Sequence, residues 1–491
     1  MTDVLARRRA GVLLHPTSLP GSGAAGTLGL EAYRFVDFLH DGGFSVWQTL
    51  PLGPPDEHGS PYCVRCAHAG DSRLIDVAEL LHFEELPGAF ALDGVVDSPA
   101  EAYRSFDLAA TPAQRALLAE FLRRHREWLL PYGLFQLCAR RFGGEPWWSW
   151  PLEFRNPVTR TLLRAWTDAK DVFRGAVLQQ YLFDLQWSAL KRYANARGVY
   201  LFGDLPFYVD LNSVEVWWSR SLFRLREDGR PEAVAGVPPD YFSADGQRWG
   251  NPLYDWERMQ KQGFAWWIAR IASQLRRFDL LRIDHFRALE SYWEIPAEAP
   301  TARKGRWRPG FGDALLTRLR QKLGDLPLVA EDLGDITDSV RALRDRFALP
   351  GMAVLQFAFD GSADNPHLPQ NHATRSVAYT GTHDNDTTLG WFAGLDPAAR
   401  HRLRERLGVA SLEMPDDLIE AAYASRAQLA VVPMQDLIGL GTQARMNTPG
   451  TSVGNWRWRF SWPDVPPGLA QKCRERAARH GRRVQTAASL L

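Results

Sequence analysis

Cysteine is scarce in this chain of 491 residues, and neither sign of charge dominates. Four cysteines occur in the whole sequence, few enough to suit a reducing cytosol, and 58 basic residues nearly balance 57 acidic ones. Such a balance provides no electrostatic attraction to nucleic acid or to an anionic membrane surface. We therefore expect neither partner, and a neutral polar ligand fits the composition better.

Long apolar runs are also missing. The basic start Arg7–Arg9 is followed only by Val12–Leu14, which is far too short for the apolar core of a signal peptide. No stretch approaches the roughly 18 apolar residues of a membrane span. These features predict a cytoplasmic protein that does not cross a membrane.

Cys63 and Cys66 form a single C-x-x-C pair without the second pair that a zinc site needs, so metal or redox chemistry there is only an alternative.

Tryptophan, by contrast, is abundant, with 19 residues in the chain. Sugar rings carry an apolar face that stacks on aromatic side chains, while their hydroxyl groups bind polar neighbours. Aromatic residues also fill the interior of any large domain. The tryptophan content is thus consistent with a carbohydrate ligand and equally with a large aromatic core.

Eight short apolar runs recur along the chain, and most are followed by a helical pattern. Strands that alternate with helices favour a parallel sheet, and eight such units predict closure into a (β/α)8 barrel. We therefore expect residues 1–491 to form one α/β barrel domain with insertions. The runs are Val12–Leu14, Val46–Leu50, Val199–Gly203, Leu280–Ile283, Leu328–Ala330, Met352–Phe359, Ser376–Tyr379 and Leu429–Val432.

Two intervals between these runs are too long for one crossover helix. Residues 55–198 contain helical patterns at Pro112–Trp128 and Val177–Arg197, which predict an inserted, largely helical subdomain. Residues 205–279 contain Ala235–Trp256, a segment rich in Pro, Gly and aromatic residues that has almost no apolar periodicity and is typical of a long ordered loop. Because long loops in compact domains are usually functional, we expect this second insertion to cover the active site.

Three of the runs end in carboxylates, namely Asp284, Glu331 and Asp384. In barrels of this type, side chains at the carboxyl ends of the strands converge on one mouth. Convergent carboxylates suit cleavage of a glycosidic bond, in which one attacks the anomeric carbon and another protonates the leaving oxygen. A helix N-cap is the alternative for each residue alone. A metal site is the alternative for the group, with the possible ligands Asp284, His285, His383, Asp384 and Asp386.

The neighbours of these carboxylates suggest different roles for them. Arg282 lies two residues before Asp284, on the same side of the strand, where its charge keeps a neighbouring carboxylate ionised and suits a nucleophile. Glu331 must instead hold its proton near neutral pH, which requires partial burial and repulsion from other carboxylates.

Motifs along nearly the full chain carry a family resemblance; they are Leu13–Gly21, Pro51–Pro54, Ser60–Tyr62, Gly203–Pro206, Val237–Trp256, Arg282–Arg287, Ala330–Gly334, Gly381–Asn385, Arg445–Gly450 and Gly454–Trp458. Together they resemble the amylomaltases, or disproportionating enzymes, of the α-amylase-like clan. The resemblance implies a barrel without a C-terminal β-sandwich, and no cofactor or metal. It also implies 4-α-glucanotransferase activity, in which α-1,4-glucan segments pass to the 4-hydroxyl of glucose or a maltooligosaccharide through a covalent glycosyl-enzyme.

The resemblance also implies roles for individual residues. Asp284 corresponds to the nucleophile, Glu331 to the general acid and base, and Asp384 to the stabiliser of the transition state. The residues implied in substrate binding are Arg282, His285 and His383 at the donor subsite, Tyr62 as a stacking residue, Asp204 after the third strand, and Asp240, Ser243, Gln247 and Trp249 on the covering segment.

One segment departs from the family pattern. Asp56–Gly59 stands where the family typically has Gly-Tyr-Gly-Asp, so we do not expect an accessory glucan site that depends on the missing tyrosine.

A hydrolase of the same barrel class and an inactive glucan-binding protein remain the alternatives in function, although the three intact carboxylates argue against the second. The sequence predicts no particular oligomeric state.

Overall fold

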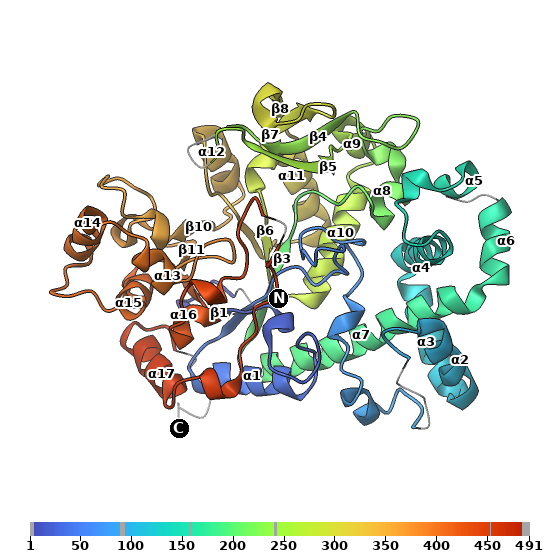
Figure 1. The fold of residues 1–491 in the computed structure, drawn as a ribbon, viewed down its shortest axis with the longest axis horizontal. Coiled ribbons are helices and arrows are strands. Elements are labelled where there is room, and N and C mark those ends of the chain that lie inside the picture. Colours follow the sequence, from blue (N-terminus) through green and yellow to red (C-terminus); the bar gives the residue numbers. More distant parts are fainter. Residues whose placement is uncertain (1–3, 89–93, 158–159, 240–242, 452, 484–491) are drawn as a thin grey trace.

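Eight parallel strands form the central barrel of the computed structural model, which describes residues 4–88, 94–157, 160–239, 243–451 and 453–483 (Figure 1). Their order in the sheet is β10-β11-β12-β1-β2-β3-β6-β9. The N–H of Ala330, at the end of β9, donates to the carbonyl of Pro350, just before β10, at 2.8 Å and so links the two edges. The strands are β1 Arg9–Leu13, β2 Val46–Gln48, β3 Tyr200–Leu205, β6 Leu280–Ile283, β9 Leu328–Ala330, β10 Gly351–Val354, β11 Ser376–Tyr379 and β12 Leu429–Pro433.

All eight apolar runs of the sequence are therefore strands, and the predicted fold class is confirmed. The predicted run Met352–Phe359 is too long, because β10 ends at Val354 and the chain turns into a 3-10 helix at Leu355–Phe357. In the described residues beyond β12 no strand occurs, and hence no β-sandwich.

Helices surround the barrel (Figure 1). Among the described residues, none of these helices has the length and apolar character that a membrane span requires. They are α1 Leu30–Asp41, α10 Ala265–Arg277, α11 Gly312–Leu323, α12 Asp338–Arg346, α13 Thr388–Ala393, α14 Pro397–Leu407, α15 Asp416–Ala424, α16 Met434–Ile438 and α17 Leu469–Arg479.

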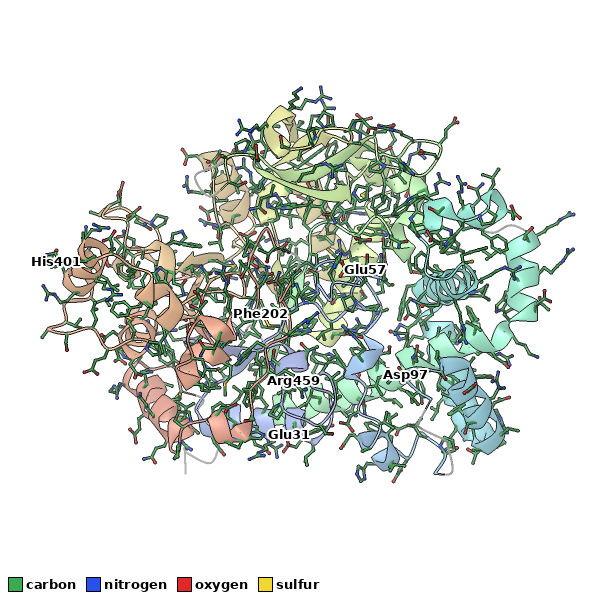
Figure 2. The ribbon with its side chains drawn as sticks, viewed as in Figure 1. Glu31, Glu57, Asp97, Phe202, His401 and Arg459 are labelled. Carbon is green, nitrogen blue, oxygen red and sulfur yellow. The ribbon has the colours of Figure 1, made fainter. Side chains whose placement is uncertain are left out.

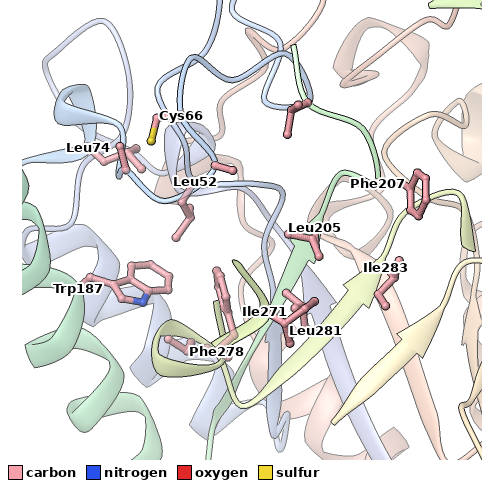
Figure 3. Close-up of a cluster of buried hydrophobic side chains, with 14 of the residues drawn as sticks. Leu52, Cys66, Leu74, Trp187, Leu205, Phe207, Ile271, Phe278, Leu281 and Ile283 are labelled. Carbon is pink, nitrogen blue, oxygen red and sulfur yellow. The ribbon is translucent and has the colours of Figure 1, made fainter. Parts of the chain in front are cut away.

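Strand β6 shows how alternate side chains divide between two cores. Leu280 belongs to a cluster inside the barrel, together with Phe202 of β3, which is labelled in Figure 2. Leu281 and Ile283 point to the other side and join the outer core with Phe278 and the helices (Figure 3). Because successive strand residues alternate, Arg282 shares the inner side with Leu280, and Asp284 continues that side past the end of the strand.

In the described residues between β2 and β3, the α-helices are α2 Pro99–Ala109, α3 Pro112–Arg124, α4 Arg126–Arg141, α5 Leu152–Arg155, α6 Arg160–Asp168 and α7 Lys170–Ala196 (Figure 1). The helical stretch predicted at Pro112–Trp128 is present, but it is divided between α3 and the start of α4. His125 has φ −111° and ψ 16°, outside the helical region, so α3 ends there and α4 begins in a new direction. The helix Val177–Arg197 is present as the second part of α7, which packs on α1 and β3.

The segment Ala235–Trp256 is not only a loop, and this prediction needs correction. It contains most of β4 (Ala233–Val237) and all of β5 (Gln247–Pro252). These pair with β7 (Ser291–Pro296) and β8 (Arg306–Pro309) in an antiparallel sheet of order β5-β4-β7-β8. The edge strand β5 exposes Arg248 and Trp249, so no apolar alternation marks it in the sequence. Short helices α8 (Val214–Trp218) and α9 (Trp256–Lys261) flank the sheet.

The outer core yields a stability prediction. Leu281 is fully buried between the barrel and its helices, whereas Leu108 on α2 is 88% exposed. Leu281→Ala leaves a cavity and is expected to lower the free energy of unfolding by about 2–5 kcal/mol. Leu108→Ala is the matched control, with an expected change within about 0.5 kcal/mol. Urea unfolding followed by circular dichroism measures both, and equal midpoints would contradict this packing.

Candidate active site

The backbone places Asp284 and Glu331 side by side at the carboxyl ends of adjacent strands. The N–H of Asp284 donates to the carbonyl of Leu205 at 3.0 Å, and the N–H of Glu331 donates to that of Ile283 at 3.0 Å. Both bonds continue the parallel pairing of β3, β6 and β9 beyond the strands themselves. The two carboxylates therefore lie at the same mouth of the barrel, as the sequence predicts.

Arg282 is the cation at the centre of this site. Its Nη1 lies 2.8 Å from both carboxylate oxygens of Asp204 and 2.9 Å from Oδ1 of Asp284. Arg282 and Asp204 are almost completely buried, at 5% and 2% exposure. A buried charge is tolerated when it is paired and hydrogen-bonded, so Arg282 and Asp204 neutralise each other and leave Asp284 facing the open side.

Glu331 is held by main-chain donors on both of its oxygens. The N–H of His285 donates to Oε2 at 2.7 Å, and the N–H of Leu333 donates to Oε1 at 2.9 Å. The first bond depends on the backbone of His285, which has φ 50° and ψ 48°, in the left-handed region that non-glycine residues rarely adopt. Such strain is typical of functional sites, and here it turns one N–H toward the carboxylate of Glu331.

The two carboxylates have different affinities for protons. Burial raises the pKa of Asp284 to about 6, although the Arg282 cation opposes this increase. Burial raises the pKa of Glu331 further, to about 7; the Arg282 cation opposes this increase, and the negative charge of Asp284 adds a smaller contribution to it. Near neutral pH the proton therefore belongs on Glu331 and the charge on Asp284. Arg282 lowers the pKa of Asp284, as the sequence predicts, but burial raises this pKa by more.

Tyr62 and His383 form one wall of the site. The hydroxyl of Tyr62 donates to Oδ2 of Asp204 at 2.8 Å, and its ring lies stacked on that of His383 at 5.0 Å between centroids. His383 Nε2 is 3.4 Å from Oδ1 of Asp384. Trp456 completes the group, since its ring centroid is 6.0 Å from both Tyr62 and His383. The wall connects Asp204, deep in the barrel, to Asp384 at the surface.

Asp384 is positioned by residues for which the sequence suggested no role. Asn447 Nδ2 donates to Asp384 Oδ1 at 2.6 Å, and Arg445 Nη2 donates to the main-chain carbonyl of Asp384 at 2.6 Å. Arg445 Nε also donates to the carbonyl of Asn447 at 2.7 Å, which ties the two residues together. The motif Arg445–Gly450 was visible in the sequence, but its distance along the chain gave no reason to pair it with Asp384.

Trp249 and His285 form the opposite wall. The Trp249 ring stands edge-on to the His285 ring with centroids 4.8 Å apart, and its Nε1 donates to Oε1 of Gln247 at 3.1 Å. Burial lowers the pKa of His285 to about 3, with help from the positive charges of Arg287 and Arg282, so the imidazole is neutral. The sheet thus brings Trp249 and Gln247 of β5 to the site.

The other two candidates of the covering segment are placed differently. Ser243 Oγ donates to the carbonyl of Gly246 at 2.8 Å, within the turn between β4 and β5. Asp240 lies outside the described residues.

The metal alternative requires a cluster of side chains that can act as ligands. Across the described ranges, no three or more His, Cys, Asp or Glu side chains are arranged to hold a metal ion. Of the proposed ligands, Asp386 accepts a hydrogen bond from Thr442 Oγ1 at 2.9 Å. Cys63 and Cys66 are free thiols, and burial raises the pKa of both. Cys66 donates to Oε1 of the buried Glu215 at 3.3 Å, which is a structural contact.

Comparison with known proteins gives consistent results over nearly the full chain. The sequence pattern of the 4-alpha-glucanotransferase family matches residues 14–464. The 4-alpha-glucanotransferase of Thermus thermophilus is 44% identical over 490 residues, which cover 96% of this chain and 98% of the relative. The chloroplastic/amyloplastic 4-alpha-glucanotransferase of Arabidopsis thaliana is 43% identical over 93% of this chain and 82% of its own length.

Solved structures agree with these relatives. The amylomaltase of Streptococcus agalactiae, solved in complex with acarbose, superposes with a TM-score of 0.92 at 34% identity, covering 97% of this chain and 100% of that one. The amylomaltase of Corynebacterium glutamicum has a TM-score of 0.74 at 18% identity, covering 97% of this chain and 75% of that one, and it supports the fold.

The two raised carboxylate pKa values predict a narrow pH optimum. With maltotriose, the substrate expected from the sequence, kcat/KM should rise as Asp284 ionises near pH 6 and fall as Glu331 loses its proton near pH 7. Because the groups interact, the two limbs report the pair rather than either residue. Initial rates measured from about pH 5 to about pH 8 test this, and a flat profile would overturn the assignment of charge and proton.

The contact between Asn447 and Asp384 predicts a loss of rate rather than of binding. Asn447→Ala removes a hydrogen bond to a charged group, so kcat should fall about tenfold to a hundredfold. The control is Gln443→Ala, an exposed side chain on the same segment, which should retain wild-type kcat. Steady-state kinetics with maltotriose separate kcat from KM, and an unchanged kcat in Asn447→Ala would show that this contact does not position Asp384 for the reaction.

Proposed function

This chain belongs to the 4-alpha-glucanotransferase family, and we propose that it transfers α-1,4-glucan segments by double displacement, with Asp284 as nucleophile and Glu331 as acid and base. The observation that carries the proposal is the pair of neighbouring carboxylates with separated proton affinities. Asp284 faces the fixed charge of Arg282, while Glu331 has the higher pKa. This division between an ionised and a protonated carboxylate is what a retaining mechanism requires.

In the first half-reaction the donor glucan is cleaved. The ionised Asp284 attacks the anomeric carbon, and the bond between that carbon and the glycosidic oxygen breaks. Glu331 gives its proton to the departing oxygen, so the released fragment leaves with a free 4-hydroxyl. The remaining fragment is bound to Asp284 as an ester with inverted configuration.

In the second half-reaction Glu331, now ionised, acts as a base. It takes the proton from the 4-hydroxyl of glucose or a maltooligosaccharide, whose oxygen attacks the anomeric carbon and displaces Asp284. The second inversion restores the α-linkage, and both carboxylates return to their initial states. The mechanism therefore needs no cofactor.

The remaining site residues bind and orient the sugar. Asp384, fixed by Asn447 and Arg445, is suited to hold the hydroxyl groups of the distorted ring. His383 and Tyr62 line the donor side, and the neutral His285 has a buried Nε2 with no protein partner, which is suited to a sugar hydroxyl. Asp204 acts through Arg282 and Tyr62 rather than on the substrate.

The insertions are proposed to favour transfer over hydrolysis. Trp249 of β5 stands against His285, so the insertion at residues 205–279 reaches the reacting centre. A wall of this kind excludes water from the ester while an acceptor sugar enters. Asp240 and Ser243 are proposed to contact the glucan from the same segment. The helical insertion at residues 55–198 carries Tyr62 and is proposed to shape the donor side.

A cytoplasmic location is proposed for the protein. The four cysteines, Cys63, Cys66, Cys138 and Cys473, are all free thiols, as expected in a reducing compartment.

The test is product analysis with maltotriose beside an Asp284→Asn variant. The wild-type enzyme should give glucose and a ladder of longer maltooligosaccharides, and the variant should lose at least about a thousandfold in rate because it has no nucleophile. Asp338→Asn, which changes an exposed carboxylate on α12, is the matched control and should keep the activity. Thin-layer chromatography distinguishes the outcomes. Maltose and glucose as sole products would indicate a hydrolase, and no turnover would leave a glucan-binding protein.

A further inference from the structure

A second groove lies on the antiparallel sheet, apart from the active site. Its volume is about 770 Å³, within the range of pockets that hold small-molecule ligands. One wall is the cross-strand pair Tyr292 of β7 and Arg308 of β8. The other walls are residues 220–227, which follow α8, and residues 254–258 at the start of α9. None of the proposed site residues lines it.

The groove is nevertheless close to the active site. Tyr254 lines the groove, and its ring is stacked on Tyr208 at 5.9 Å with an interplanar angle of 13°. The Tyr208 centroid is 6.4 Å from that of His285, which belongs to the active-site wall. Two buried aromatic rings, Tyr254 and Tyr208, therefore separate the groove from the active-site wall at His285.

Most of the charges of the groove are paired with opposite charges, which disfavours a strongly anionic ligand. Arg224 is bonded to Glu294 and lies 3.7 Å from Glu232, and Arg258 lies 3.6 Å from Asp255. Paired charges attract no ion, but they leave N–H donors next to carboxylate acceptors. The charged lining residues are the cations Arg220, Arg224, Arg226, Arg258 and Arg308 and the anions Glu227, Glu232, Asp255 and Glu257.

This alternation of donors and acceptors matches the hydroxyl groups of a sugar. Neighbouring hydroxyls on a pyranose ring accept from a guanidinium and donate to a carboxylate at the same time. At the rim, the half-buried Phe311 ring is stacked on Trp256 at 6.1 Å with an angle of 13°, which provides a flat apolar surface for the C–H face of the ring. The groove therefore offers both the hydrogen-bonding groups and the apolar surface that a sugar ring requires.

We propose that this groove is a second, non-catalytic binding site for a segment of α-1,4-glucan. The inference rests on the proposed function, because the ligand is the same polymer that the active site cleaves. A chain bound in the groove raises its own effective concentration at the catalytic cleft, so long glucans gain affinity that short ones lack. A maltotriose molecule is too short to occupy both sites and gains nothing from the groove.

The test is to block the groove and compare long with short substrates. Ser221 is exposed and lines the groove, so Ser221→Trp fills it with an indole ring. Arg258→Ala is a milder second variant that removes an exposed donor and leaves the fold intact. Gln260→Trp is the matched control, since Gln260 is exposed on α9 but outside the groove.

In both groove variants, KM for amylose should rise at least fivefold, while kcat/KM for maltotriose stays within twofold of wild type. Gln260→Trp should match the wild-type enzyme with both substrates. In native gels that contain amylose, Ser221→Trp should migrate faster than wild type. An amylose KM within twofold of wild type in both variants would overturn the proposal. Failure of wild-type enzyme to disproportionate maltotriose would instead overturn the proposed function, so the two results are distinguishable.

Discussion

The shared contact of Arg282 with Asp204 and Asp284 is the constraint on which the rest of the site depends. A guanidinium inside a barrel is tolerated only with a buried counter-ion, and Asp204 supplies it from the adjacent strand. The same Asp204 accepts from Tyr62, which orients His383 and through it the wall that ends at Asp384. One buried ion pair thus fixes the positions of groups that come from four distant parts of the chain.

The antiparallel sheet fixes the positions of residues on the other side of the active site. Trp249 of β5 contacts His285, and Trp307 of β8 lies under the guanidinium of Arg287, 3.9 Å from its ring centroid. Arg287 also donates to the main-chain carbonyl of Asp335, which follows Glu331. The loops that carry Asp284 and Glu331 are therefore linked to one another and to the sheet. The geometry of the candidate site depends on the antiparallel sheet as well as on the barrel.

Much of this architecture follows from local patterns in the sequence. Buried parallel strands are continuous apolar runs, and each was recognisable because both of its faces are covered. The edge strand β5 was not recognisable in the sequence, because Arg248 and Trp249 face solvent and break the alternation of apolar and polar residues. The break at His125 was hidden for another reason, since the residues on both sides of it are good helix formers. The partnership of Asn447 with Asp384 depends on tertiary structure alone, so no local pattern encodes it.

The contact of Asn447 with Asp384 is made by a residue that is synthesised late. Asn447 and Arg445 follow β12, the last strand, and β12 pairs with β1, the first. Arg459, which is labelled in Figure 2, then donates to the main-chain carbonyls of Leu19, Gly21 and Gly23 near the start of the chain. A chain still emerging from the ribosome therefore has all three carboxylates well before Asp384 has its partners. The contacts that position Asp384 therefore form only after β12 has been synthesised and the residues that follow it have folded back onto the barrel.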